Sequence, residues 1–309
     1  MLVAAAHFVM PAPAAAQLNS QHLKGTTGLK SGSQPPPGVY IIAPVFYRYS
    51  ADEVKDRDGR RVTLNADGDL SSNVYATGVN VVTGKKLFGG VYGFQILFPV
   101  GANNRIQGTE IDANPGAGLS DSVVTPISLG WHSPRADTIT SYTMYLPTGR
   151  YSDGASNNTG LGMWGHELGI GTTVYLTESR QWHAATLASF GFQSKKEDSE
   201  TKVGNVMHLE GGVGADFLKG GLIVGLNYYS SLKLTEDEIG SLPEILVRGK
   251  NKVFALGPEV QLALARKGTL YGFLKVNYQW ETYARTTTQG SALTVLATWL
   301  LKPLKLPTP

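Results

Sequence analysis

The stretch Leu270-Tyr-Gly-Phe-Leu-Lys-Val-Asn-Tyr-Gln-Trp-Glu281 alternates between apolar and polar side chains. Neighbouring side chains of an extended strand point to opposite faces, so this alternation places the two kinds on different sides. The apolar set is Leu270, Leu274, Val276, Tyr278 and Trp280, and the polar set is Lys275, Asn277, Gln279 and Glu281. An apolar outer face with a polar inner face is typical of a strand in a membrane β-barrel.

The same period of two recurs along most of the chain and predicts an all-β protein. We expect strands near 38–49, 73–83, 87–98, 122–132, 135–146, 164–176, 181–193, 202–217, 220–230, 251–265, 269–281 and 290–300. About twelve antiparallel strands, an even number, predict a transmembrane up-and-down barrel.

The predicted connections alternate in length. Short ones fall at 83–87, 133–134, 177–180, 218–219 and 266–268, and longer ones at 50–72, 99–121, 147–163, 194–201, 231–250 and 282–289. Bacterial outer-membrane barrels have short periplasmic turns and long external loops, so this alternation places both termini on the periplasmic side.

Composition excludes several other classes of protein. Of the 309 residues, 42% are hydrophobic and 17% are charged, and no run approaches the roughly 18 consecutive apolar residues of a membrane helix. The net charge of +3 comes from scattered lysines and arginines, which argues against nucleic acid as a partner. With no cysteine, the chain has neither disulfides nor thiolate metal sites.

The chain divides into four predicted segments. Residues 1–16 resemble a signal peptide that ends at the small residues Ala14-Ala15-Ala16, with a disordered Ala/Pro tail as the alternative. Residues 17–37 are rich in Gly, Ser and Pro, and we expect them to be extended, either as a flexible periplasmic tail or as a plug inside the lumen. Residues 38–301 form the predicted barrel, and 302–309 form a C-terminal tail.

Aromatic residues mark the predicted membrane interfaces. Trp131, Trp164, Trp182, Trp280 and Trp299 all fall on the apolar side of their strands and near a strand end. Amphipathic rings prefer the two interfaces of a bilayer, so Trp164 and Trp280 would mark the outer one and the other three the periplasmic one. We expect Tyr145, Phe192 and Tyr228 in the outer girdle as well. The alternative fold is a soluble β-sandwich or a soluble barrel.

The polar faces of the strands predict a set of lumen residues. A charged side chain that faces lipid near mid-bilayer costs about 2–4 kcal/mol for Arg or Lys, so these groups should line the interior. They are Arg48, Gln95, Glu167, Glu210, Glu259, Lys275 and Asn277, together with the aromatics Tyr40, Phe46, Tyr229, Tyr271 and Phe273. Two interpretations remain open: a constriction that sets selectivity, or a salt-bridged network that holds a narrow barrel shut.

Three short segments carry a family resemblance. Gly28–Tyr40, Leu146–Tyr151 and His208–Glu210 ahead of a glycine-rich strand resemble the outer-membrane family named for the MetA pathway of phenol degradation. The resemblance implies a barrel similar to hydrocarbon and fatty-acid channels, linked with uptake of aromatic or other hydrophobic compounds. Outer-membrane barrels usually end in an aromatic residue, whereas this chain continues past Trp299 to Pro309.

Chemistry of other kinds finds little support in the sequence. A lipase would pair Ser152 or Ser156 with His166, but a Gly-x-Ser-x-Gly elbow is missing. The acidic stretch from Asp52 to Asp69 lacks the full calcium-loop pattern, and we expect it to solvate an external loop. The histidines His132, His183 and His208 have no metal-ligand spacing, so we expect neither a metal nor a cofactor.

We therefore expect a Gram-negative outer-membrane channel that is not an enzyme. It would pass small hydrophobic or aromatic compounds by passive or facilitated diffusion. Its other partners would be outer-membrane lipid, lipopolysaccharide and the barrel assembly machinery. The alternative is a closed structural or adhesive barrel whose function lies in the loops 103–121 and 151–163.

Overall fold

The computed structural model describes residues 20–61, 69–107, 112–113, 116–153, 155, 157–238 and 250–305. Strands dominate these residues, and the single short helical turn is the 3-10 turn η1 (Leu218–Gly220). None of the described residues forms a helix that is long and apolar enough to span a membrane.

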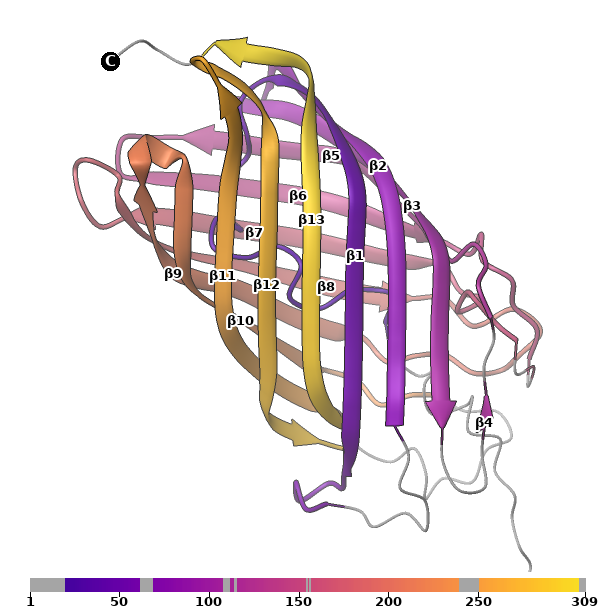
Figure 1. The fold of residues 1–309 in the computed structure, drawn as a ribbon. Coiled ribbons are helices and arrows are strands. Elements are labelled where there is room, and N and C mark those ends of the chain that lie inside the picture. The colour runs from indigo at the N-terminus through magenta and orange to yellow at the C-terminus, as the bar shows by residue number, and fades with distance from the viewer. Residues whose placement is uncertain are drawn as a thin grey trace, which may run out of the picture.

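Twelve long strands form one closed antiparallel ring (Figure 1). They are β1 (Gly38–Lys55), β2 (Asp69–Leu87), β3 (Gly90–Gln107), β5 (Ser122–His132), β6 (Ala136–Leu146), β7 (Gly165–Tyr175), β8 (Trp182–Gln193), β9 (Val206–Phe217), β10 (Leu222–Lys233), β11 (Lys252–Arg266), β12 (Thr269–Arg285) and β13 (Thr287–Lys305). Strand β1 pairs with both β2 and β13, which closes the ring, and the two-residue strand β4 (Asp112–Ala113) adds only to the end of β3. The predicted twelve-stranded barrel is confirmed.

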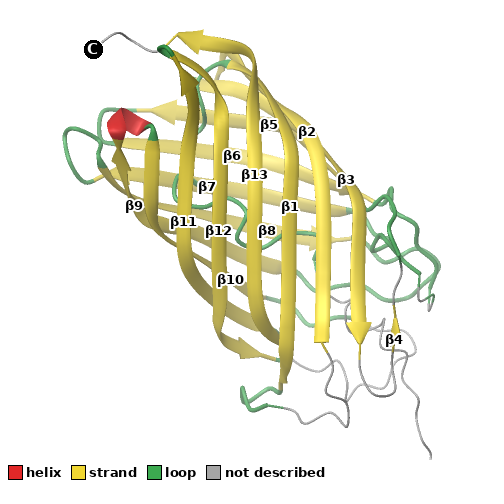
Figure 2. Ribbon diagram, in the orientation of Figure 1, coloured by secondary structure: helices red, strands yellow, loops and turns green. Residues whose placement is uncertain are grey.

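Connections of two lengths lie at the two ends of the barrel (Figure 2). The short hairpins include Phe88–Gly89 and Lys267–Gly268, where all four residues have positive φ. The prediction of a loop over 282–289 is wrong. Strand β12 continues to Arg285 and β13 begins at Thr287, so only Thr286, with a φ of 54°, lies between them. The predicted tail also begins too early, since β13 extends to Lys305.

A bulge in β1 reverses the side-chain parity of that strand. Its register with both neighbours shifts between Ile42 and Val45, around Pro44, whose ring nitrogen has no hydrogen to donate to the ladder. Tyr40 faces inward before the bulge, and Tyr47 faces inward after it. Arg48 is therefore exposed on the outside, and its predicted place in the lumen is wrong. Phe46 faces outward for the same reason and packs against Tyr75.

An apolar belt covers the outside of the barrel. Exposed residues on successive outward positions include Leu168, Ile170, Val174, Val213, Leu226, Leu256, Val260 and Val276. The side chains of Trp164, Trp182, Trp280 and Trp299 are 44–49% exposed on the same surface, and Trp131 is half-buried there. Tyr145 departs from the prediction, because it is buried and its hydroxyl donates to Glu167 inside the barrel.

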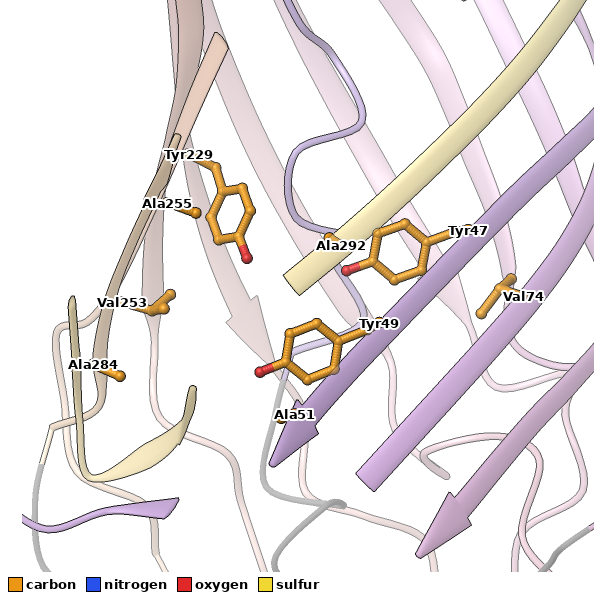
Figure 3. Packing of buried hydrophobic residues seen from close by; sticks show 9 residues of the cluster. All are labelled: Tyr47, Tyr49, Ala51, Val74, Tyr229, Val253, Ala255, Ala284 and Ala292. Atoms are coloured by element: carbon orange, nitrogen blue, oxygen red, sulfur yellow. The ribbon is translucent and has the colours of Figure 1, made fainter. Parts of the chain in front are cut away.

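The interior is filled by polar groups and by chain rather than by a large apolar core. One cluster of buried hydrophobic residues lies between β1, β2, β10, β11, β12 and β13 and includes Tyr47, Tyr49 and Tyr229 (Figure 3). The residues around it on the inner wall are largely polar or charged and buried, and these define the candidate site.

Candidate functional site

The segment 20–37, called here the lumen segment, runs through the inside of the barrel. At the end with the long loops, the Gln21 amide donates to the carbonyl of Met163 at 2.7 Å. At the end where β1 begins, the Tyr40 hydroxyl donates to the carbonyl of Pro36 at 2.6 Å. The indigo trace within the ring in Figure 1 follows this path. The lumen segment therefore spans the barrel from the external loops to the short-turn rim.

Glu210 of β9 binds the lumen segment through several donors at once. Its carboxylate accepts from His22 Nε2 at 3.0 Å and from the backbone N–H of Thr27 at 3.1 Å. The N–H of Gly25 and the hydroxyl of Thr27 also donate to it. Glu210 is only 2% exposed, so these are charge-assisted hydrogen bonds shielded from water, which are stronger than neutral ones.

Strands β11 and β12 hold the next part of the lumen segment. Glu259 accepts from the N–H of Leu29 at 3.2 Å and from the amide of Asn227 at 2.9 Å. The ammonium of Lys275 donates to the carbonyls of Thr26 and Thr27, and the amide of Asn277 donates to the carbonyl of Gly25 at 3.0 Å. The wall thus satisfies backbone groups of a segment that has no regular structure of its own.

Two glycines allow this close approach. Gly28 has a φ of +79°, a conformation that favours glycine, and a Cβ there would lie 2.1 Å from a carboxylate oxygen of Glu259. A Cβ on Gly32 would lie 2.0 Å from the backbone carbonyl carbon of Thr172 in β7. Glycine at these two positions therefore lets the lumen segment lie against the wall, where a side chain would clash.

Lys24 and Glu281 connect the lumen segment to the aromatic cluster. The Lys24 ammonium lies 3.0 Å from the Glu281 carboxylate. It also lies 5.1 Å from the ring centroid of Tyr49 and 5.5 Å from that of Tyr229. The hydroxyls of both tyrosines donate to Glu281 at 2.8 Å. Figure 3 shows these rings, with Tyr47, reaching from β1 and β10 into the same space. Lys24 is therefore held by a carboxylate and by the faces of two aromatic rings.

A second set of charges fastens the lumen segment near the short-turn rim. Asp137 of β6 accepts from the Ser33 hydroxyl at 2.8 Å and the Tyr175 hydroxyl at 2.6 Å, and it pairs with Arg180 at 3.0 Å. Lys30 pairs with Asp216 of β9 at 2.7 Å. Contacts at both ends of the barrel thus restrain the segment.

The wall separates at one place near the external loops. Pairing of β12 with β13 ends with Trp280 beside Ser291, while β12 stays paired with β11 up to Arg285 and β13 stays paired with β1 from Thr287. An open hollow of about 520 Å³ lies at this split. Its lining comprises Ser50, Glu53, Trp280, Glu281, Gln289, Gly290 and Ser291.

Comparison with known proteins agrees with this architecture. Residues 51–297 match the family described as "Putative MetA-pathway of phenol degradation". The chain belongs to this family. Its fold is similar to the COG4313 outer membrane channel from Pseudomonas putida F1, with a TM-score of 0.74 and 14% identity over 88% of this chain and 98% of that one.

More distant barrels match less well. The translocator domain of the autotransporter NalP from Neisseria meningitidis has a TM-score of 0.44 and 11% identity, covering 86% of this chain and 89% of that one. No curated protein matches the chain. Family and fold together identify a member of the MetA-pathway family whose barrel has the fold of an outer-membrane channel.

The structure brings most of the predicted lumen residues together in this family member. Five of them are buried on the inner wall, and each forms a hydrogen bond with the lumen segment: Glu167, Glu210, Glu259, Lys275 and Asn277. Gln95 is half-buried on the inner face, beside Thr125 in the register of β3 and β5. Arg48 lies outside, and Tyr271 is 42% exposed.

Several residues that join the lumen segment to the wall were not predicted from the sequence. They are His22, Lys24, Asp137, Asp216 and Glu281. Glu281 lies on the polar face of the stretch that predicts the fold, so its parity could have included it among the lumen residues. For His22 and Lys24 no periodic signal exists, because they precede the first strand.

A buried lysine in the external loops gives a pH-dependent stability. Lys196, between β8 and β9, is 5% exposed, and its Nζ has no hydrogen-bond partner among the described residues. Burial lowers the pKa of Lys196 to about 8, although the carboxylates of Asp153 and Asp121 partly oppose the shift. An unfolded lysine has a pKa of about 10.4, so between roughly pH 8 and 10.4 the unfolded chain binds more protons and folding becomes more favourable as pH rises.

Lys196→Met should remove this dependence. At pH 7 the substitution is expected to raise the free energy of unfolding by roughly 3 kcal/mol, at about 1.4 kcal/mol per pKa unit. Urea unfolding of the barrel in detergent micelles at pH 7 and pH 10 measures it. Lys195→Met is the matched control, because the neighbouring Lys195 is exposed and pairs with Glu200. Equal pH dependence in wild type and Lys196→Met would contradict the account.

Proposed function

We propose that this outer-membrane channel passes small hydrophobic or aromatic molecules by passive diffusion, and that the lumen segment closes it at rest. The observation that carries the proposal is the inner aromatic cluster of Tyr47, Tyr49 and Tyr229. The rings of Tyr49 and Tyr229 face the ammonium of Lys24, which belongs to the lumen segment. Displacement of Lys24 would free ring faces on which an aromatic solute can stack.

Charge pairing supports closure as the resting state. Glu210 and Glu281 of the wall pair with His22 and Lys24 of the lumen segment at 3.0 Å. Glu259 accepts from the N–H of Leu29, and all three carboxylates belong to residues that are at most 4% exposed. Removal of one partner from such a buried pair leaves an uncompensated charge, which is costly. Opening therefore requires that solute or water replace several contacts together, which favours rare and brief opening.

The split between β12 and β13 supports a hydrophobic solute. The hollow there is lined by Trp280, which faces the lipid side, and by Glu281, which faces the lumen and binds Tyr49 and Tyr229. A solute that partitions into lipid could pass at this place between the aromatic cluster and the outer part of the membrane. A strictly polar solute gains nothing from such a path, since the surrounding outer surface is apolar.

Uptake by intact cells tests the function. In a porin-deficient Gram-negative host, expression of the chain should accelerate uptake of radiolabelled phenol or toluene over that of cells with an empty vector, with little effect on a sugar of similar mass. Uptake that rises linearly with external concentration, without an energy source, is expected of passive diffusion. Equal rates with and without the protein for every compound would instead support the closed structural barrel.

Selectivity is tested by one tyrosine on each side of the wall. Tyr229→Ala removes an inward ring, so the ratio of aromatic to sugar uptake should fall about threefold or more, given about 0.5–1.5 kcal/mol for an aromatic pair. Tyr228→Ala removes the outward ring next to it, which packs against Phe254, and should leave the ratio unchanged. Heat-modifiable migration on gels verifies that both variants fold. An unchanged ratio in Tyr229→Ala would remove the aromatic cluster from the path.

A further inference from the structure

Two histidines and a glutamate meet where the lumen segment crosses β7 and β9. His22 Nδ1 lies 2.9 Å from Glu167 of β7, and the rings of His22 and His208 of β9 stack with centroids 4.1 Å apart. One ligand atom from each of these residues can be chosen so that all three lie within 4.8 Å of one another. Residues distant in sequence thus form a compact group of potential metal ligands.

The surroundings of the group also favour a ligand. His208 is 2% exposed, and its Nδ1 is buried without a hydrogen-bond partner among the described residues, while its Nε2 lies 3.2 Å from the Ser20 hydroxyl. A buried polar atom without a partner costs free energy unless something satisfies it. The second carboxylate, Glu210, lies 3.0 Å from His22 Nε2, the nitrogen that faces away from Glu167, and so can fix the orientation of the ring.

We propose that His22, His208 and Glu167 form a binding site for a divalent transition-metal ion of the zinc class, with Glu210 holding the ring of His22 through its Nε2. Two imidazoles and a carboxylate are a donor set that Zn²⁺ uses in proteins, and imidazole also suits Cu²⁺ and Ni²⁺. Mg²⁺ and Ca²⁺ prefer sites made only of oxygen ligands, so they fit this group poorly. Ligation requires His22 Nδ1 to bind the ion in place of its hydrogen bond to Glu167, and one of the two stacked rings to rotate, because nearly parallel rings do not direct their lone pairs at one point.

Such a site would link the lumen segment to the wall. His22 belongs to the segment, whereas Glu167 and His208 belong to β7 and β9. A metal bound by all three would add a bond between the segment and two strands of the barrel. Metal binding would therefore stabilise the closed arrangement, because a ligand that binds only the folded, closed form lowers the free energy of that form.

Metal titration of the intact barrel tests the proposal. The protein is purified without a histidine tag in detergent, stripped with chelator, and titrated with Zn²⁺ by calorimetry. We expect saturable binding of one Zn²⁺ per chain, and visible absorption bands of a tetrahedral complex when Co²⁺ is used. Mg²⁺ at the same concentrations should produce no saturable heat.

Variants assign the ligands. His22→Ala and His208→Ala should each weaken Zn²⁺ binding at least tenfold. His132→Ala is the matched control, because His132 pairs with Asp137 at the other end of the barrel, and its affinity should equal that of wild type. His22 lies outside the barrel strands, so His22→Ala keeps the test valid if His208→Ala does not fold. No saturable binding by wild type, or wild-type affinity in His22→Ala, would overturn the proposal.

Discussion

Glu210→Ala is expected to open the channel. The Glu210 carboxylate accepts hydrogen bonds from His22, Gly25 and Thr27, and a hydrogen bond to a charged group contributes about 1.5–3 kcal/mol. Loss of this acceptor leaves several buried donors of the lumen segment without a partner, so the segment should leave its place for a much larger fraction of the time. Single-channel recording in planar bilayers should show conductance several times that of wild type.

The control for this experiment is a carboxylate that does not contact the lumen segment. Glu178 is exposed in the short turn between β7 and β8, and Glu178→Ala should leave the conductance unchanged. Glu210→Gln should give an intermediate result, because the amide oxygen can still accept but has no charge. If Glu210→Ala folds and conducts as wild type does, the lumen segment does not limit passage.

Ile170→Arg is expected to destabilise the barrel strongly. Ile170 lies midway along β7, points outward and is 59% exposed. An arginine that faces lipid at the bilayer midplane costs about 2–4 kcal/mol. The free energy of unfolding, measured by denaturant titration in phospholipid vesicles, should fall by about that amount, and less of the heat-modifiable folded form should be recovered.

Leu176→Arg is the matched control on the same side of the barrel. Leu176 follows the last residue of β7, Tyr175, and is 53% exposed. The cost of arginine falls to about 0–1 kcal/mol near the interface, so this variant should remain close to wild type. Equal losses at the two positions would show that depth in the membrane does not determine the effect and would contradict the lipid-facing assignment.

The fold could be predicted because its strands follow a single rule. A residue in a barrel strand meets either lipid or the interior, so the period of two in segments such as 272–281 reports both the strand and its orientation. At the start of the same strand the register shifts between Leu270 and Gly272, so Leu270 is buried and Tyr271 is exposed, opposite to the prediction. The same parity placed Glu167, Glu210, Glu259, Lys275 and Asn277 on the inner wall. Arg48 failed because the bulge at Pro44 shifts the phase of β1, and alternation alone does not reveal where a strand gains a residue.

The candidate site could not be predicted to the same extent. The lumen segment has no periodic pattern, so its sequence allowed both a tail and a plug and did not show which wall residues it would contact. The pairs Lys24–Glu281 and His22–Glu210 join residues far apart in the chain, and they follow from the path of the segment through the closed ring. The short connection at Thr286 was missed for another reason, since the polar run 285–291 suggests a loop, whereas residues 287–291 pair with β1 and Arg285 pairs with β11.

The closure of β1 against β13 constrains how the protein can assemble. The lumen segment is continuous with β1, and the ring closes where β1 pairs with β13 from Tyr40 beside Leu300 to Lys55 beside Thr287. If the ring closed first, the ammonium groups of Lys24 and Lys30 would have to thread past the wall carboxylates one by one. If the segment binds Glu210 and Glu259 on the still open sheet, the last step only encloses it. The lumen segment would then be ordered inside before the pairing of β1 with β13 seals the wall.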